Sequence, residues 1–160
     1  MIGVSGSGKT TWVNSQKGYV VCSTDSILEE LAELMGISYT EAFEYIQNNK
    51  KFDYIEQKFF EKIHDCIINE KDFVIDRTHL KRHIRISLIN QFRTIAAESG
   101  KHLELLAVSF ELPQSVLFER LKNREKSGGK SIPKSVILKQ INSFDTPTID
   151  EGFDAIERIT

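Results

Sequence analysis

The residues best suited to chemistry lie in one short stretch from Gly3 to Thr10, which reads Gly-Val-Ser-Gly-Ser-Gly-Lys-Thr. The stretch matches G-x-x-x-x-G-K-[ST], a loop that joins a strand to a helix and binds phosphate groups. Gly6 and Gly8 let the backbone curl so that successive N–H groups point into one concavity. Lys9 would reach the β- and γ-phosphates, and the Thr10 hydroxyl would bind Mg²⁺. A Gly/Ser-rich turn with a chance lysine is the alternative, but the four fixed positions favour a nucleoside triphosphate site.

Two arginines farther along the chain have a spacing that suits phosphoryl transfer. Arg120 and Arg124 are four residues apart, so they project from the same face of one helix, and Gly128-Gly129 follows as a hinge. Such arginines can cover a transferring phosphate, so we expect a lid over residues 113–132. The alternative is a solvated basic face paired with Glu119 or Glu125. We expect ATP to be bound by Ser5, Gly6, Ser7, Gly8, Lys9, Thr10, Thr11, Arg120 and Arg124.

Two carboxylates follow short apolar runs. Asp25 comes just after Tyr19–Cys22 and would act as the general base for an attacking hydroxyl, or alternatively cap the following helix. The sequence leaves these two roles open. Asp76 ends Phe73–Ile75, as a Walker-B-type acid does, and would hold Mg²⁺ through water or steer Lys9. Its alternative is an ordinary carboxylate in a turn.

A basic segment follows Asp76. Arg77, Lys81, Arg82 and Arg85 could receive the phosphates of an acceptor, although a plain surface patch explains them equally well. Of the four histidines, only His79 lies near the expected site, and none has metal or triad spacing. The predicted acceptor site therefore comprises Asp25, Asp76, Arg77, His79, Lys81 and Arg82.

Composition is ordinary for a soluble domain, with 160 residues, 40% hydrophobic and 28% charged. The net charge of −2 hides an uneven distribution, with twelve acids and five bases in 25–72 but seven bases and one acid in 120–139. Basic blocks suit a phosphate-rich substrate. Apolar runs are strand-sized, so we expect no membrane span, and two isolated thiols, Cys22 and Cys66, suit the cytoplasm.

Periodicity predicts alternating strands and helices. Only Met1 and Ile2 precede the loop, so we expect a truncated first strand. The other expected strands are 19–22, 73–76, 103–110 and 153–159, and the expected helices are 10–17, 25–35, 39–48, 53–69, 78–99, 114–124 and 133–144. This order predicts a single α/β domain over 1–160, a three-layer fold with about five mainly parallel strands and helices on both faces.

Taken together, these landmarks resemble the kinase domain of polynucleotide 5′-hydroxyl kinases, a P-loop kinase group. The resemblance covers nearly the whole chain and rests on Gly3–Thr10 with Thr11-Trp12, Ser23-Thr24-Asp25, Val74–His79, Arg120-x-x-x-Arg124, Ile132-Pro133, Phe144, Pro147 and Glu151-Gly152-Phe153. It implies an ATP- and Mg²⁺-dependent kinase that phosphorylates the 5′-OH of RNA or DNA. It also implies that Lys9 is catalytic, Asp25 the base, and Arg120 and Arg124 a phosphate clamp.

The chain departs from that family in two places. Leu28 stands where the phage type has an acceptor-binding arginine, and His79 stands in place of the usual Asn. Arg77, Lys81 or Arg82 would substitute. A phosphatase or ligase partner would lie on another chain or outside residues 1–160. The alternatives are a small-molecule or nucleoside-monophosphate kinase, a nucleotide-driven switch or motor module, and a nucleotide-binding regulatory module without chemistry. The absence of Asn-Lys-x-Asp counts against a GTPase.

Overall fold

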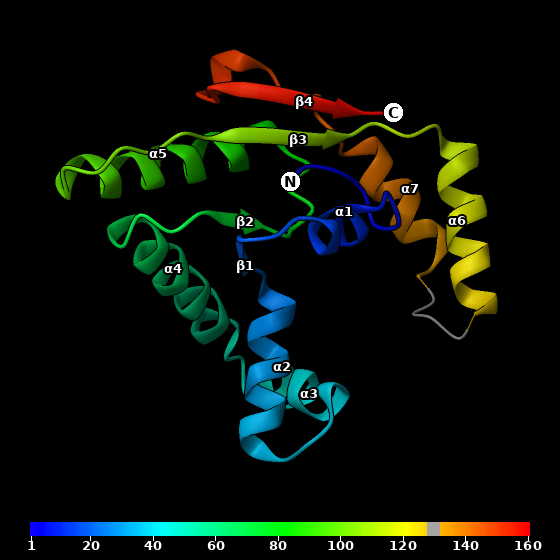
Figure 1. Ribbon diagram of the computed structural model, residues 1–160. Helices are drawn as coiled ribbons and strands as arrows, with labels where there is room; N and C mark the ends of the chain where they lie inside the picture. Colours follow the sequence, from blue (N-terminus) through cyan, green and yellow to red (C-terminus); the bar gives the residue numbers. More distant parts are fainter. Residues whose placement is uncertain (128–131) are drawn as a thin grey trace. The chain divides into compact units, whose positions relative to one another are not determined.

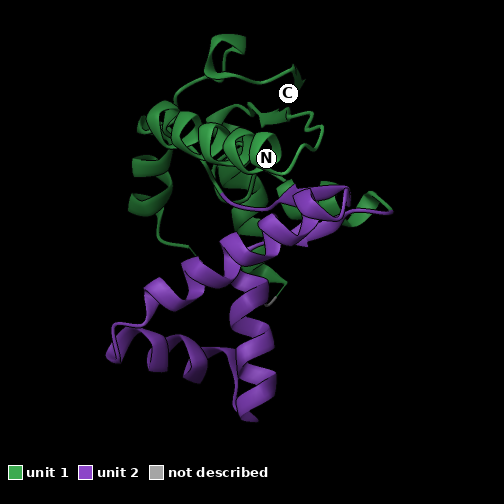
Figure 2. Cartoon of the chain, turned by 90° about the vertical axis from the view of Figure 1, so that its left-hand side faces the viewer, with its two compact units in different colours: residues 1–17, 78–160 green, residues 18–77 purple. Residues whose placement is uncertain are grey.

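The short apolar runs of the sequence form the strands of this structure, a computed structural model that describes residues 1–127 and 132–160 (Figure 1). The chain divides into two compact units (Figure 2). Unit 1 comprises residues 1–17 and 78–160, and unit 2 comprises residues 18–77. Unit 2 is thus inserted into the sequence of unit 1, and each is described by itself.

Unit 2 consists of a small parallel sheet and three helices. Strands β1 (Val20–Cys22) and β2 (Phe73–Ile75) pair in parallel, and the helices are α2 (Thr24–Met35), α3 (Tyr39–Asn48) and α4 (Phe52–Ile68). Helix α4 buries one apolar stripe, in which Phe59 and Ile63 have no exposed surface. Burying such a side chain contributes about 1.5–3 kcal/mol, so this stripe is a main source of the unit's stability.

Unit 1 carries the phosphate loop and the other sheet. Strand β3 (Leu106–Phe110) pairs in parallel with β4 (Ala155–Ile159), and Ile2 forms a single parallel bridge to Ser109. The helical elements of this unit are α1 (Lys9–Ser15), α5 (Arg82–Glu98), α6 (Gln114–Lys126), α7 (Lys134–Asn142) and the 3₁₀ turn η1 (Ile149–Glu151). Val4, Leu80 and Leu117 form a buried cluster that packs the start of the loop against the segment before α5 and against α6.

Most predicted helices are confirmed to within two residues, and α3 has the expected bounds. Helix α5 was expected from residue 78 but begins at Arg82. Its start is displaced because His79 has a φ of 42°, outside the helical range, and because Oδ2 of Asp145 accepts the Arg82 N–H at 2.9 Å.

The α/β class and the parallel pairing are confirmed, but a sheet of about five strands is not seen. Within the described residues the strands form two separate two-stranded sheets, because β1 and β2 are only three residues long and Ile2 adds only a bridge. The expected Gly128-Gly129 hinge lies outside the described residues, so the lid over 113–132 stays a prediction. The single domain over 1–160 also stays a prediction. Among the described helices, none has the length and apolar character that crossing a bilayer requires.

Candidate active site

The backbone of the phosphate loop has the geometry that its glycines predict. Gly6 and Gly8 have φ values of 83° and 99°, which side chains other than glycine rarely adopt. Within the described part of the chain, neither of their N–H groups donates to a protein acceptor. Two unused N–H donors on a curled loop before a helix are what an anion requires.

Lys9 folds back onto the start of the same loop. Its Nζ donates to the carbonyl oxygens of Gly3 and Val4, each at 2.9 Å, and the residue is 8% exposed. These carbonyl dipoles compensate for the burial of the ammonium group. The charge is therefore held inside the loop, where phosphate oxygens would be bound.

Helices α6 and α7 both contact the loop backbone. Nη1 of Arg120 donates to the Ser7 carbonyl at 3.1 Å, and Oε1 of Gln140 accepts the Ser5 N–H at 2.8 Å. A methyl group at Gly6 would come within 2.8 Å of Leu121, so α6 packs directly against the loop. Arg124 lies one turn after Arg120 on α6 and is exposed.

Gln140 was not expected from the sequence. It is 135 residues from Ser5, and a single glutamine in an amphipathic helix gives no local signal. Only the assembled unit reveals that its amide oxygen satisfies a loop donor.

Thr10 and Thr11 lie in the first turn of α1, and both residues are exposed. Within the described residues no cluster of three or more His, Cys, Asp or Glu side chains could form a metal cage. Mg²⁺ usually takes one or two protein ligands together with substrate phosphates and waters. A hydroxyl ligand at Thr10 fits this chemistry.

In unit 2, the helix-capping role of Asp25 is taken by another residue. The N-cap of α2 is Ser23, whose Oγ accepts the Ser26 N–H at 2.9 Å. Asp25 lies in the first turn and is exposed. Its Oδ1 accepts a hydrogen bond from the Tyr39 hydroxyl at 3.0 Å. Burial, and then the hydrogen bond to Asp25, raise the pKa of Tyr39 to about 12, so this phenol remains a donor at neutral pH.

Asp76 and Arg77 follow β2 in the same unit. The Asp76 N–H donates to the Cys22 carbonyl at 3.0 Å, so the parallel pairing continues to the end of both strands. Asp25 and Asp76 therefore follow the carboxyl ends of paired strands, as the sequence predicted. Arg77 binds both oxygens of Glu56, at 2.8 and 3.0 Å, and lies over the Phe59 ring, so a phosphate would have to compete with these contacts.

The rest of the basic segment lies in unit 1. Lys81 and Arg82 are exposed, and Arg82 pairs with Asp150 at 2.7 Å. Arg85 is only 2% exposed and is held by Glu151. The suggestion that Arg85 receives acceptor phosphates is therefore wrong, because its guanidinium is buried and already paired.

Unit 1 thus brings together the loop residues 5–11, Arg120 and Gln140. It also joins the loop to the segment that carries His79, because the Gly3 N–H donates to the Thr78 carbonyl at 3.1 Å. Asp25, Asp76 and Arg77 belong to unit 2.

Comparison with known proteins agrees with this geometry. A search of curated proteins found no match to the chain. A family model described as an AAA domain matches residues 1–147. The match includes the phosphate loop, all of unit 2 and unit 1 as far as residue 147, and it supports a kinase- or NTPase-type activity. Because the model covers most of the sequence, the chain belongs to this AAA domain family, within the P-loop kinase group.

Proposed function

We propose that this protein is an ATP-dependent kinase that transfers the γ-phosphate to the 5′-hydroxyl of a polynucleotide, RNA or DNA. The observation that carries the proposal is the loop itself. It offers the unused N–H groups of Gly6 and Gly8, the enclosed charge of Lys9, and the guanidinium of Arg120 at 3.1 Å from the Ser7 carbonyl. These groups suit a triphosphate whose terminal phosphate is transferred.

The charge of the two units supports a polyanionic acceptor. Unit 1 has 15 basic and ten acidic residues, a net charge of +5, whereas unit 2 has six basic and 13 acidic residues, a net charge of −7. The basic charge is thus concentrated in the unit that carries the phosphate loop. A field of this kind attracts nucleic acid and makes its binding sensitive to salt.

In the proposed reaction, the 5′-oxygen forms a bond to the γ-phosphorus while the bond from that phosphorus to the β-bridging oxygen breaks. Asp25 accepts the hydroxyl proton, and ADP leaves. Lys9, Arg120 and Arg124 neutralise charge on the transferring phosphoryl group. Thr10, and Asp76 through water, would hold Mg²⁺, which would supply positive charge at the β- and γ-phosphates. Lys81, Arg82, Arg77 and His79 would bind the acceptor.

The test is a transfer assay with ATP labelled in the γ-phosphate and a panel of acceptors. The panel contains 5′-OH oligonucleotides of RNA and DNA, nucleosides, nucleoside monophosphates and sugars. We expect label only on the 5′ end of the oligonucleotides. Label on a monophosphate or a sugar, with none on oligonucleotides, would instead establish a small-molecule kinase.

A further inference from the structure

His79 has a backbone conformation that needs an explanation. Among the residues that the structure describes, three non-glycine residues have positive φ, namely Lys50, Glu70 and His79. Lys50 and Glu70 directly follow the C-cap residues of α3 and α4, where a left-handed residue is common. His79 follows no helix and has a φ of 42° between β2 and α5. Such conformations persist where the surroundings impose them, and they concentrate at functional sites.

The surroundings of His79 do impose it. The carbonyls of three consecutive residues all accept hydrogen bonds from other parts of unit 1. Thr78 accepts from the Gly3 N–H at 3.1 Å, and Leu80 accepts from the Asp145 N–H at 2.9 Å. Nη1 of Arg85 donates to the His79 carbonyl at 3.0 Å and to the Leu80 carbonyl at 2.9 Å.

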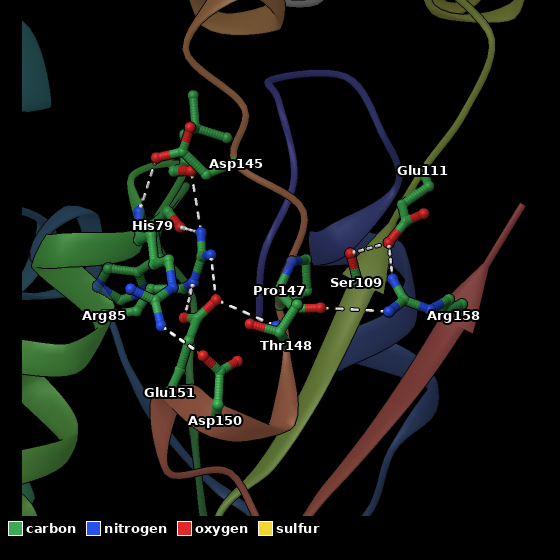
Figure 3. A network of polar contacts seen from close by, with 12 residues as sticks. His79, Arg85, Ser109, Glu111, Asp145, Pro147, Thr148, Asp150, Glu151 and Arg158 are labelled. Atoms are coloured by element: carbon green, nitrogen blue, oxygen red, sulfur yellow. Dashed lines mark hydrogen bonds and ion pairs between the residues drawn. The ribbon is translucent and has the colours of Figure 1, made fainter.

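Arg85 is held in turn by Glu151 (Figure 3). Nε and Nη2 of Arg85 donate to the two carboxylate oxygens, both at 2.7 Å, and the side chains are 2% and 0% exposed. Oε1 of Glu151 also accepts the Thr148 N–H at 3.1 Å, which fixes the carboxylate within the η1 turn. A buried ion pair contributes little stability beyond what well-packed apolar residues of similar size provide. Stability alone therefore does not account for this pair.

The same segment is joined to the phosphate loop in two ways. One is the hydrogen bond between Gly3 and Thr78, and the Gly3 carbonyl itself accepts from Lys9. The other is the buried cluster that contains Leu80 and Val4. A displacement of residues 78–80 would thus be transmitted to the loop, and the loop fixes where His79 lies.

We propose that Arg85 and Glu151 are positioning residues for phosphoryl transfer, which hold His79 and the rest of segment 78–80 in place beside the phosphate loop. The inference rests on the proposed function and extends it to two buried residues that do not touch the substrate. Arg85 acts through the carbonyls of His79 and Leu80, and Glu151 acts through Arg85.

The experiment replaces the pair by apolar residues of similar size, Arg85→Met with Glu151→Met, in the full chain. We expect the melting temperature to stay within a few degrees, because this exchange leaves no charge buried without a partner. We expect kcat/KM for a 5′-OH oligonucleotide to fall at least about tenfold, with KM for ATP within about twofold. Arg93→Met is the control, since Arg93 also binds the C-terminal segment from α5, through Gly152 and Asp154, but not residues 78–80.

A double-mutant cycle with His79→Ala separates positioning from general destabilisation. If the pair acts through His79, its replacement costs little further activity once His79 is alanine. Equal losses of activity with and without His79, or a folded Met/Met variant with wild-type kinetics, would overturn the proposal.

If the Met/Met variant fails to fold, His79→Gly is decisive, because glycine adopts positive φ without strain. We expect it to keep its melting temperature and lose at least tenfold in kcat/KM, and unchanged kinetics would refute the positioning role. Wild-type protein that phosphorylates no oligonucleotide would overturn the proposed function itself.

Discussion

The hydroxyl of Tyr39 donates a hydrogen bond to Oδ1 of Asp25 at 3.0 Å, across 14 residues of sequence. This contact orients the carboxylate from the first turn of the next helix. The other carboxylate oxygen of Asp25 takes no part in this hydrogen bond. A general base requires such an oxygen to accept the proton. Because Ser23 caps α2, the two roles that the sequence left open for Asp25 can now be tested separately.

Asp25→Asn should lower transfer to a 5′-OH oligonucleotide at least about a hundredfold, since a positioned base typically contributes about 10²–10⁴-fold. Asparagine keeps the size of the side chain and removes the basic oxygen. Melting temperature and ATP affinity should stay near wild type. Initial rates under single-turnover conditions measure the effect.

Ser23→Ala is the matched control for Asp25→Asn. It removes the cap and should lower the free energy of unfolding by about 1 kcal/mol while transfer rates stay close to wild type. The base assignment fails if the asparagine variant remains active.

Lys9→Ala and Thr10→Ala should each abolish transfer. Lys9→Ala removes both the charge at the phosphates and the two bonds to the carbonyls of Gly3 and Val4, so ATP binding should also weaken. Thr10→Ala removes the proposed metal ligand from an exposed position and should leave the fold intact. ATP titration by calorimetry and transfer assays at increasing Mg²⁺ concentrations distinguish the two. Near-normal turnover of either variant is incompatible with the loop's assignment.

Gly6→Ala should weaken ATP binding at least about tenfold. The residue has a φ of 83°, and the added methyl group would lie 2.8 Å from Leu121, so either the loop or α6 must shift. Gly36→Ala is the matched control, because its φ is also positive, at 66°, but no atom lies within 4 Å of the new methyl group. The control should cost about 1 kcal/mol of stability without changing ATP affinity. Equal ATP affinity in both variants would contradict the prediction.

Arg120→Ala should lower kcat/KM for transfer by about 10²-fold, because Arg120 contacts the loop at Ser7 and would neutralise the transferring group. Lys122→Ala, on the same helix and exposed, should have little effect except at low salt. Steady-state kinetics at two ionic strengths check both variants. Similar losses in both would indicate a general electrostatic effect rather than a specific contact.

Alkaline pH should destabilise the fold in a defined window. Burial raises the pKa of Cys22 to about 12, and that of Tyr39 also reaches about 12. Between the ordinary thiol pKa of about 8.5 and 12, the folded state retains protons that the unfolded state releases, so the free energy of unfolding falls as pH rises. Urea titrations at pH 8 and pH 11 measure the difference. Cys22→Ala should reduce this pH dependence, and an unchanged slope would exclude the thiol as its source.

The sequence predicted the local parts of this fold well. Gly36 ends α2 with a φ of 66°, and Pro133 directly precedes α7, because glycine and proline act through their own backbone geometry. The curl of the loop at Gly6 and Gly8 follows from the same local physics. These features depend on a few neighbouring residues and can be inferred from the sequence.

The parts that the sequence did not predict depend on distant contacts. From the sequence, Arg85 was expected to belong to a basic surface segment. In the structure it is buried and paired with Glu151, which is 66 residues away. The late start of α5 depends on Asp145, which is 63 residues from Arg82. Gln140 and η1 were also not predicted from the sequence. Hydrophobic periodicity carries no information about such pairs.

The bond between Ser5 and Gln140 also has a consequence for how the protein is made. The phosphate loop is synthesised before its partners Thr78, Arg120 and Gln140, which follow it by as many as 135 residues. Contacts of such long sequence separation slow folding, because a large chain loop must be closed before they form. Residues 18–77, which make their own sheet and core, can fold while synthesis continues. A nascent chain that stops short of Gln140 therefore lacks the acceptor of the Ser5 N–H and one of the contacts that fix the phosphate loop.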